Sequence, residues 1–340
     1  MTMIGRRPVS VLSGFLGSGK TTLLRGHLQN HPGDDLVVII NEWGAVGLDH
    51  HLIRRVNEQT ILLQGGCLCC ARREDLVRTL RELLDLEQCG EMPAIRQVVI
   101  ETSGLADPAP VLFTIAADPV LKHHFAVASV VVTLDAVNAG DQIESQPEVC
   151  KQLVAADRVV ITKPDLATGE RVAELRAWVR QLNPTARIFV SCLGEAAEAL
   201  DLPDEAEHAR AAPATLEPKL APHPDVQSAT LGFSGPLDWP AFSVWLGMLL
   251  EAHGPKALRI KGLLDIGAGG PVALNTAQHT VHPPEHLPAW PQGSSEAYLV
   301  FITRGIDPVR IASSLEAFQR AGGRSGFRVK RIDLSFGEMA

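Results

Sequence analysis

Cysteine and positive charge are both scarce in this sequence. Six cysteines in 340 residues are too few for a disulfide scaffold, so clustered thiols indicate metal ligands or redox groups. The three that stand apart, Cys89, Cys150 and Cys192, are expected to be buried as small hydrophobic residues. A formal net charge of -8 disfavours a protein that coats nucleic acid or an anionic surface. We therefore predict no nucleic-acid partner.

Long apolar runs and an export signal are missing as well. No stretch approaches the roughly 18 apolar residues that cross a bilayer. The first residues lead at once into an apolar strand, without the charged start, apolar run and small-residue cleavage site of a signal peptide. We expect a cytoplasmic protein with no membrane partner. With 46% hydrophobic residues, the chain can fill a sizeable core and two domains.

Short runs rich in Val and Ile alternate with helical spacing over the first two hundred residues. Continuous apolar runs are typical of strands buried on both faces. The alternation predicts an α/β fold with a doubly wound, mostly parallel sheet of βαβ units. The predicted strands are Pro8–Ser13, Leu36–Ile40, Thr60–Leu63, Val98–Glu101, Val127–Leu134, Arg158–Thr162 and Arg187–Val190, and the clearest helices are Ala71–Leu86 and Gly169–Leu182.

The composition changes after residue 200. Five prolines among Ala and Glu at residues 201–227 indicate a linker. We expect a P-loop domain at 1–200, this linker, and a smaller α+β domain at 228–340. The elements predicted for the smaller domain are strands at Ser228–Phe233, Leu258–Ile266, Val272–His279, Ala297–Thr303 and Phe327–Asp333 and helices at Trp239–His253 and Pro308–Ala321.

The strongest motif is Gly14-Phe15-Leu16-Gly17-Ser18-Gly19-Lys20-Thr21, which matches G-x-x-x-x-G-K-[ST]. It lies between a predicted strand and a predicted helix, a context that disfavours a chance glycine loop. The glycines let backbone N–H groups surround phosphates, and the helix N-terminus adds a favourable dipole. Lys20 should reach the β and γ phosphates, and the hydroxyl of Thr21 should hold Mg²⁺. The predicted nucleotide contacts are Gly14, Gly17, Ser18, Gly19, Lys20, Thr21 and Thr22.

The base is indicated by Thr162-Lys163-Pro164-Asp165 at the end of a predicted strand. An ionised Asp165 can accept hydrogen bonds from both N1–H and the exocyclic amine of guanine, and adenine offers no such pair. Thr162, Lys163 and Asp165 are therefore predicted GTP contacts. The alternative is that Asp165 only caps a helix. Ser191-Cys192-Leu193, after the next strand, stands where another guanine-contacting loop is expected.

A third motif, Glu101-Thr102-Ser103-Gly104, ends the strand predicted at Val98–Glu101. A carboxylate there can hold Mg²⁺ through water, and the Gly104 amide can sense the γ phosphate. We assign Lys20, Glu101 and Gly104 to the hydrolysis of GTP to GDP and phosphate, and Thr21 and Glu101 to Mg²⁺. Leu105 stands where a Ras-like GTPase carries its water-orienting glutamine, so we expect slow hydrolysis.

Three thiols, Cys67, Cys69 and Cys70, lie within four residues just before a predicted helix. Thiolates select Zn²⁺ or Cu(I) over Mg²⁺. Three permanent ligands leave a site open to exchange, whereas a structural zinc takes four. A thiol cluster without metal, or a redox pair, remains an alternative. The candidates for a fourth ligand are Glu42, His50 and His51.

Together these motifs resemble the CobW-type family of GTP-dependent metal chaperones, relatives of the nickel-delivery GTPases for urease and hydrogenase. The cysteine block Gly66-Cys67-Leu68-Cys69-Cys70 before a helix is the most specific of them. The resemblance implies a GTPase domain joined to a ferredoxin-like C-terminal domain. It also implies Zn²⁺, or Co²⁺, Ni²⁺ or Fe²⁺, bound beside the nucleotide, and a client metalloprotein as recipient. Ala45 replaces an acidic residue usual in the first switch, which removes one potential ligand.

Three interpretations of the function stay open. In the first, GTP gathers the cysteines around a metal ion, and hydrolysis releases the ion to a client. In the second, the chain is a regulatory P-loop GTPase with structural or redox cysteines and a protein effector. A P-loop kinase or ATPase would use the same phosphate loop, and the sequence leaves a homodimer open.

Overall fold

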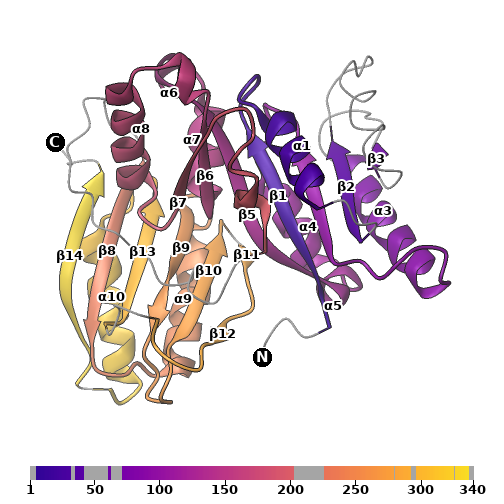
Figure 1. Ribbon diagram of the computed structural model, residues 1–340. Helices are drawn as coiled ribbons and strands as arrows, with labels where there is room; N and C mark the ends of the chain where they lie inside the picture. Colours follow the sequence, from indigo (N-terminus) through magenta and orange to yellow (C-terminus); the bar gives the residue numbers. More distant parts are fainter. Residues whose placement is uncertain are drawn as a thin grey trace. The chain divides into compact units, whose positions relative to one another are not determined.

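The computed structural model describes residues 5–31, 35–41, 60–62, 71–202, 226–278, 280–291, 296–324 and 326–336. These residues form two compact units (Figure 1). One unit contains the described residues up to Ala173 together with those from Arg187 to the end of the 71–202 range. The other contains Glu174–Ala186 and the described residues from 226 onward. Each unit holds one β-sheet.

Seven strands among the described residues form the sheet of the first unit. Every neighbouring pair is parallel, in the order β3-β2-β4-β1-β5-β6-β7. The predicted α/β doubly wound sheet is thus confirmed, and each predicted strand is present with its ends moved by at most two residues. The strands are β1 (Arg7–Gly14), β2 (Leu36–Asn41), β3 (Thr60–Leu62), β4 (Gln97–Thr102), β5 (Phe125–Asp135), β6 (Arg158–Thr162) and β7 (Arg187–Ser191).

Helices cover both faces of this sheet. Along β2, Val38 and Ile40 join one buried cluster with Leu24 of α1, whereas Val37 and Ile39 join another with helix α3. Successive strand residues point to opposite faces, which explains why the strands are apolar throughout. The helices of the first unit are α1 (Lys20–Asn30), α3 (Ala71–Gln88), α4 (Ala109–Ala117), α5 (Leu121–His124), α6 (Ala139–Ser145) and α7 (Pro147–Ala155), with short 3-10 turns η1 (Pro164–Leu166) and η2 (Ala197–Leu200). Helix α8 (Gly169–Leu182) begins in the first unit, and its residues from Glu174 onward belong to the other.

The sheet of the second unit is antiparallel throughout its described residues. Its strands lie in the order β11-β10-β9-β13-β8-β14, with β12 paired to β10. Without β10 to β12, the order is that of a β-α-β-β-α-β ferredoxin-like sheet, so this expectation is confirmed. The elements are β8 (Gln227–Ser234), α9 (Trp239–His253), β9 (Ala257–Leu264), β10 (Val272–Ala277), β11 (Thr280–Val281), β12 (Glu285–His286), β13 (Tyr298–Thr303), α10 (Pro308–Ala321) and β14 (Arg328–Phe336).

The strand predicted at Val272–His279 ends earlier than expected. β10 stops at Ala277 because Gln278 takes a left-handed conformation with φ of 50°, which interrupts an extended strand. His279 lies outside the described residues. In the described part of the chain, we find no helix with both the length and the apolar character to cross a bilayer.

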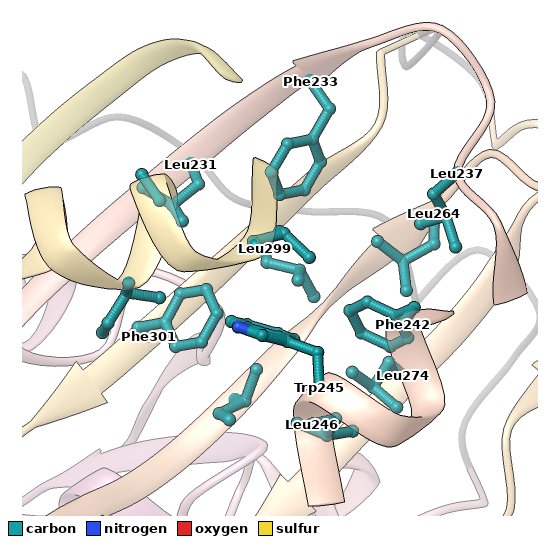
Figure 2. Packing of buried hydrophobic residues seen from close by; sticks show 14 of the residues in the cluster. Leu231, Phe233, Leu237, Phe242, Trp245, Leu246, Leu264, Leu274, Leu299 and Phe301 are labelled. Atoms are coloured by element: carbon teal, nitrogen blue, oxygen red, sulfur yellow. The ribbon is translucent and has the colours of Figure 1, made fainter. Parts of the chain in front are cut away.

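Aliphatic and aromatic side chains together form the core of the second unit (Figure 2). Trp245 of α9 lies between Phe242 and Phe301, with ring centroids 5.6 and 6.3 Å away. The buried indole also needs a hydrogen-bond partner, and its Nε1 donates to Ser314 Oγ at 3.0 Å. The contacts join α9, β13 and α10 in one core.

Candidate nucleotide-binding site

The phosphate loop connects β1 to α1 at the carboxyl edge of the parallel sheet, where α/β proteins bind ligands. Gly14, Gly17 and Gly19 have φ of 140°, 71° and 92°, a region that favours glycine. A Cβ on Gly14 would lie 2.6 Å from the carbonyl oxygen of Thr133. No side chain caps the start of α1, so its first amides remain available for an anion.

Lys20 and Thr21 occupy the first turn of α1. Lys20 is buried, and its Nζ donates to the carbonyl oxygens of Gly14 at 2.9 Å and Phe15 at 3.2 Å, so the ammonium lies over the loop. Thr21 Oγ1 donates to Oε1 of the buried Glu101 at 3.0 Å. The structure thus brings together the two residues predicted for Mg²⁺. A hydroxyl and a carboxylate are hard oxygen donors that fit this ion. Thr22 is exposed in the same turn.

The segment after β4 packs directly on the phosphate loop. A Cβ on Gly104 would lie 2.7 Å from the backbone nitrogen of Leu16, so only glycine fits without a shift. The buried Gln152 of α7 donates from Nε2 to the carbonyl oxygens of Gly104 at 3.2 Å and Ala106 at 3.0 Å. Sequence reasoning missed Gln152, whose only signal was an amide on the apolar side of α7. Leu105, with its side chain partly exposed, has no group that could orient water.

The predicted guanine motif makes hydrogen bonds to the phosphate loop. Thr162 Oγ1 donates to the carbonyl oxygen of Ser18 at 2.8 Å. Lys163 takes a left-handed conformation with φ of 54°, and its Nζ donates to the carbonyl oxygen of Gly17 at 2.8 Å and to Asp135 Oδ2 at 2.6 Å. These hydrogen bonds fix the position of the predicted guanine motif relative to the phosphate loop.

Asp135, at the end of β5, is the second functional residue that sequence reasoning missed. Its side chain is 1% exposed, and a carboxylate ending the apolar run Val127–Leu134 was the available signal. Burial acts to raise the pKa of this carboxyl. Hydrogen bonds from Lys163, the Asn138 side chain and the Val137 amide outweigh burial and keep the pKa of Asp135 below its ordinary value.

Asp165 lies at η1, within reach of the loop that follows β7. Cys192 Sγ donates to Asp165 Oδ1 at 3.3 Å, so the two segments predicted to contact guanine are adjacent. This hydrogen bond raises the pKa of the Cys192 thiol. The expectation of three buried cysteines is wrong for two of them. Cys150 is buried, whereas Cys192 is half-buried in this loop and Cys89 is exposed just after α3.

The predicted transition-metal ligands Cys67, Cys69, Cys70 and Glu42 lie outside the described residues. The same holds for Ala45, for the alternative fourth ligands His50 and His51, and for most of the predicted linker. Their role remains a prediction from the sequence.

Comparison with known proteins agrees with this geometry. Residues 8–190 match the family model described as CobW/HypB/UreG, nucleotide-binding domain. Residues 226–319 match that of the cobalamin synthesis protein cobW C-terminal domain. The zinc chaperone YjiA of Escherichia coli is 32% identical over 260 residues, which cover 75% of this chain and 81% of that protein.

Two further likenesses extend the comparison. The zinc chaperone CobW of Pseudomonas aeruginosa is 32% identical over 227 residues, or 57% of this chain and 59% of that protein. The crystal structure of the Zn(II)-bound YjiA GTPase from E. coli covers 92% of this chain and 99% of its own, at 25% identity and a TM-score of 0.65. The chain therefore belongs to the CobW/HypB/UreG family of nucleotide-binding proteins.

Proposed function

We propose that this protein is a GTPase that binds a transition-metal ion, with zinc favoured, and passes it to a client metalloprotein under GTP control. The observation that carries the nucleotide half is the double contact of Lys163 with Gly17 and Asp135. It places the loop bearing Asp165 beside the phosphate loop. The zinc half is supported by the thiol block and by the zinc chaperones to which the chain is similar.

Each nucleotide-site residue has a defined task in this proposal. The N-terminal amides of α1 and the Lys20 ammonium bind the β and γ phosphates. Thr21 and Glu101 hold Mg²⁺, which when bound neutralises charge that develops on the phosphates. The Gly104 amide lies beside the phosphate loop, where it can contact the γ phosphate. Gln152 holds this segment in place through its hydrogen bonds to the carbonyl oxygens of Gly104 and Ala106. Because Leu105 cannot orient a water molecule, hydrolysis is slow until a partner supplies that group.

The cargo site consists of Cys67, Cys69 and Cys70, with Glu42 as a fourth ligand. Thiolates favour Zn²⁺, and Co²⁺, Ni²⁺ and Fe²⁺ are the other candidates. A reducing cytoplasm keeps such thiols available, and we place the protein there. We also propose the domain limits 1–200 and 228–340, with the linker at 201–227.

The central test measures Zn²⁺ affinity by competition with a chromophoric chelator, with Mg²⁺ and a GTP analogue, with GDP, and without nucleotide. We expect the tightest binding with the GTP analogue, and its loss in Cys67→Ser. Cys89→Ser is the matched control, because Cys89 is an exposed thiol outside the block. Linkage requires zinc to tighten GTP binding by the same factor, about 5- to 150-fold for typical couplings. Equal zinc affinity in all three states would contradict the proposal.

Guanine selectivity has a separate test. In Asp165→Asn, the amide can donate to the 2-oxo group of xanthine but can no longer accept two hydrogen bonds from guanine. We expect GTP affinity to fall by about 10²-fold or more and xanthosine triphosphate to bind instead. A fluorescent-nucleotide competition assay measures both. An unchanged preference for GTP would show that Asp165 does not recognise the base. A regulatory GTPase without a metal cargo would show the same change of nucleotide preference in Asp165→Asn, but it would remain active in Cys67→Ser.

A further inference from the structure

A second group of metal-ligating side chains lies at the end of α1 remote from the phosphate loop. His27 and His31 lie one helical turn apart, and Asp201 follows η2. His27 Nδ1 and His31 Nε2 are each 3.5 Å from Asp201 Oδ1, and the three ligand atoms lie within 4.8 Å of one another. Ligands bound to one zinc ion at about 2.0–2.2 Å in a tetrahedron are about 3.3–3.6 Å apart. We propose that His27, His31 and Asp201 form a second site for a divalent transition metal.

The buried member of the group is otherwise unexplained. The His27 side chain is 0% exposed, yet neither of its ring nitrogens makes a hydrogen bond of normal geometry, and Asp201 Oδ1 makes none either. The Ala197 carbonyl lies near enough to raise the pKa of His27, but it is not in such a hydrogen bond. Buried polar atoms are rarely left in this state, because each has lost its hydrogen bonds to water without replacing them. A cation between these atoms would satisfy His27 Nδ1 and Asp201 Oδ1 together.

An ion pair between His27 and Asp201 is the competing explanation. Burial, followed by the neighbouring His31, lowers the pKa of His27 to about 4, and these effects outweigh the raising effects of Asp201 and the Ala197 carbonyl. His27 Nδ1 and Asp201 Oδ1 are also 3.5 Å apart without a hydrogen bond, whereas the atoms of a charged pair approach to about 2.7–2.9 Å, so the geometry disfavours an ion pair. A neutral imidazole is the form that binds metal ions.

His31 is already oriented as a ligand. Its Nδ1 lies 3.1 Å from the carbonyl oxygen of His27, and since a carbonyl only accepts, Nδ1 carries the proton. This tautomer leaves the Nε2 lone pair facing Asp201. Metal-bound histidines are usually fixed by such a hydrogen bond from the other ring nitrogen.

The donor set defines the class of ion. Two imidazoles and one carboxylate suit Zn²⁺, Co²⁺ or Ni²⁺, and lack the thiolates that select Cu(I). The side chains of His31 and Asp201 are 30% and 44% exposed, so a fourth position is open to water and the ion can exchange.

The site also joins two segments next to the nucleotide loops. α1 begins at Lys20, and a Cβ on Gly26 would lie 2.7 Å from the carbonyl oxygen of Gly194, in the loop that carries Cys192. An ion bound by His27, His31 and Asp201 would therefore link the end of α1 to the segment that follows this loop, where η2 ends. The pattern His-x-x-x-His was visible in the sequence, but its third ligand lies 170 positions from His31.

The experiment uses the full chain with Cys67→Ser, Cys69→Ser and Cys70→Ser, which removes the proposed cargo site. Titrated with Co²⁺, it should bind about one ion per chain, with visible d–d bands and without the thiolate charge-transfer band of the cysteine site. Adding His31→Ala should weaken Zn²⁺ binding at least about 10-fold by chelator competition. His123→Ala, which removes an exposed histidine of α5, is the matched control and should change nothing.

A second readout guards against misfolding. Zn²⁺ should raise the thermal midpoint of the triple-serine chain, but not that of the same chain carrying Asp201→Asn. Far-UV circular dichroism and GTP affinity establish that each variant is folded. No bound ion in the triple-serine chain, or equal affinity with and without His31, overturns the proposal. Either result leaves the proposed cargo function intact, because that function rests on the cysteines.

Discussion

The contact between Lys163 and Asp135 gives the sharpest test of the nucleotide site, through the substitution Asp135→Asn. The asparagine keeps the shape and the acceptor for the Val137 amide but loses the charge that faces Lys163 Nζ at 2.6 Å. A hydrogen bond to a charged group contributes about 1.5–3 kcal/mol and a neutral one about 0.5–1.5 kcal/mol. Lys163 is 36% exposed, so water replaces part of the loss. We expect a decrease of about 1 kcal/mol in the free energy of unfolding, or about 2–4 °C in Tm.

The pH dependence separates this cause from a packing defect. The folded pKa of Asp135 lies below the ordinary value of 3.8. A carboxyl with a depressed pKa stabilises the fold fully above its unfolded pKa, and this stability is lost as the pH falls through the folded pKa. The difference between the natural chain and Asp135→Asn should therefore be constant at neutral pH and shrink below about pH 4. Urea unfolding at a series of pH values measures this difference in stability. If it persists unchanged at low pH, the charge of Asp135 is not its cause.

The same substitution should weaken nucleotide binding, because Lys163 also holds the carbonyl oxygen of Gly17. A loss of about 1 kcal/mol in loop positioning corresponds to about a 5-fold lower GTP affinity, measured with a fluorescent GTP analogue. Asp141→Asn, an exposed carboxylate on α6, is the matched control. GTP affinity that matches the natural chain would show that the pair does not position the loops.

Three further outcomes are expected. Gly104→Ala brings a methyl group to 2.7 Å from the Leu16 backbone and should lower GTP affinity by about 10-fold, measured by calorimetry, since overpacking costs about 1–3 kcal/mol; full affinity would contradict the close approach. Trp245→Ala leaves a large cavity in the core of the second unit. It should lower the free energy of unfolding, measured with urea, by about 3–5 kcal/mol, with GTP affinity retained. Asp238→Ala removes the side-chain cap of α9, whose bond to the Ala241 amide is 2.9 Å, and should cost about 1 kcal/mol; a smaller Tm change than that of Trp245→Ala is the check.

Most helices and strands could be predicted from the sequence, because caps, turn residues and hydrophobic spacing involve residues close together in the chain. Helix Trp239–His253 has the predicted bounds because Asp238 caps its start, proline fits its first turn and Gly254 follows its end. β5 runs from Phe125 to Asp135, longer than the predicted Val127–Leu134, because pairing with β1 and β6 extends it at both ends. A hydrophobic run predicts the buried part of a strand. The full length of the strand depends on how far it pairs with the adjacent strands.

Residues close together in the chain were enough to predict the doubly wound class and to recognise the phosphate loop, the Thr162-Lys163-Pro164-Asp165 motif and the thiol block. Which distant side chains meet depends instead on how the chain folds. Asp135 contacts Lys163 because β5 and β6 are neighbours and end at one edge of the sheet. His31 approaches Asp201 because η2 returns the chain to the end of α1. Such contacts depend on strand order and helix packing, which no local periodicity encodes.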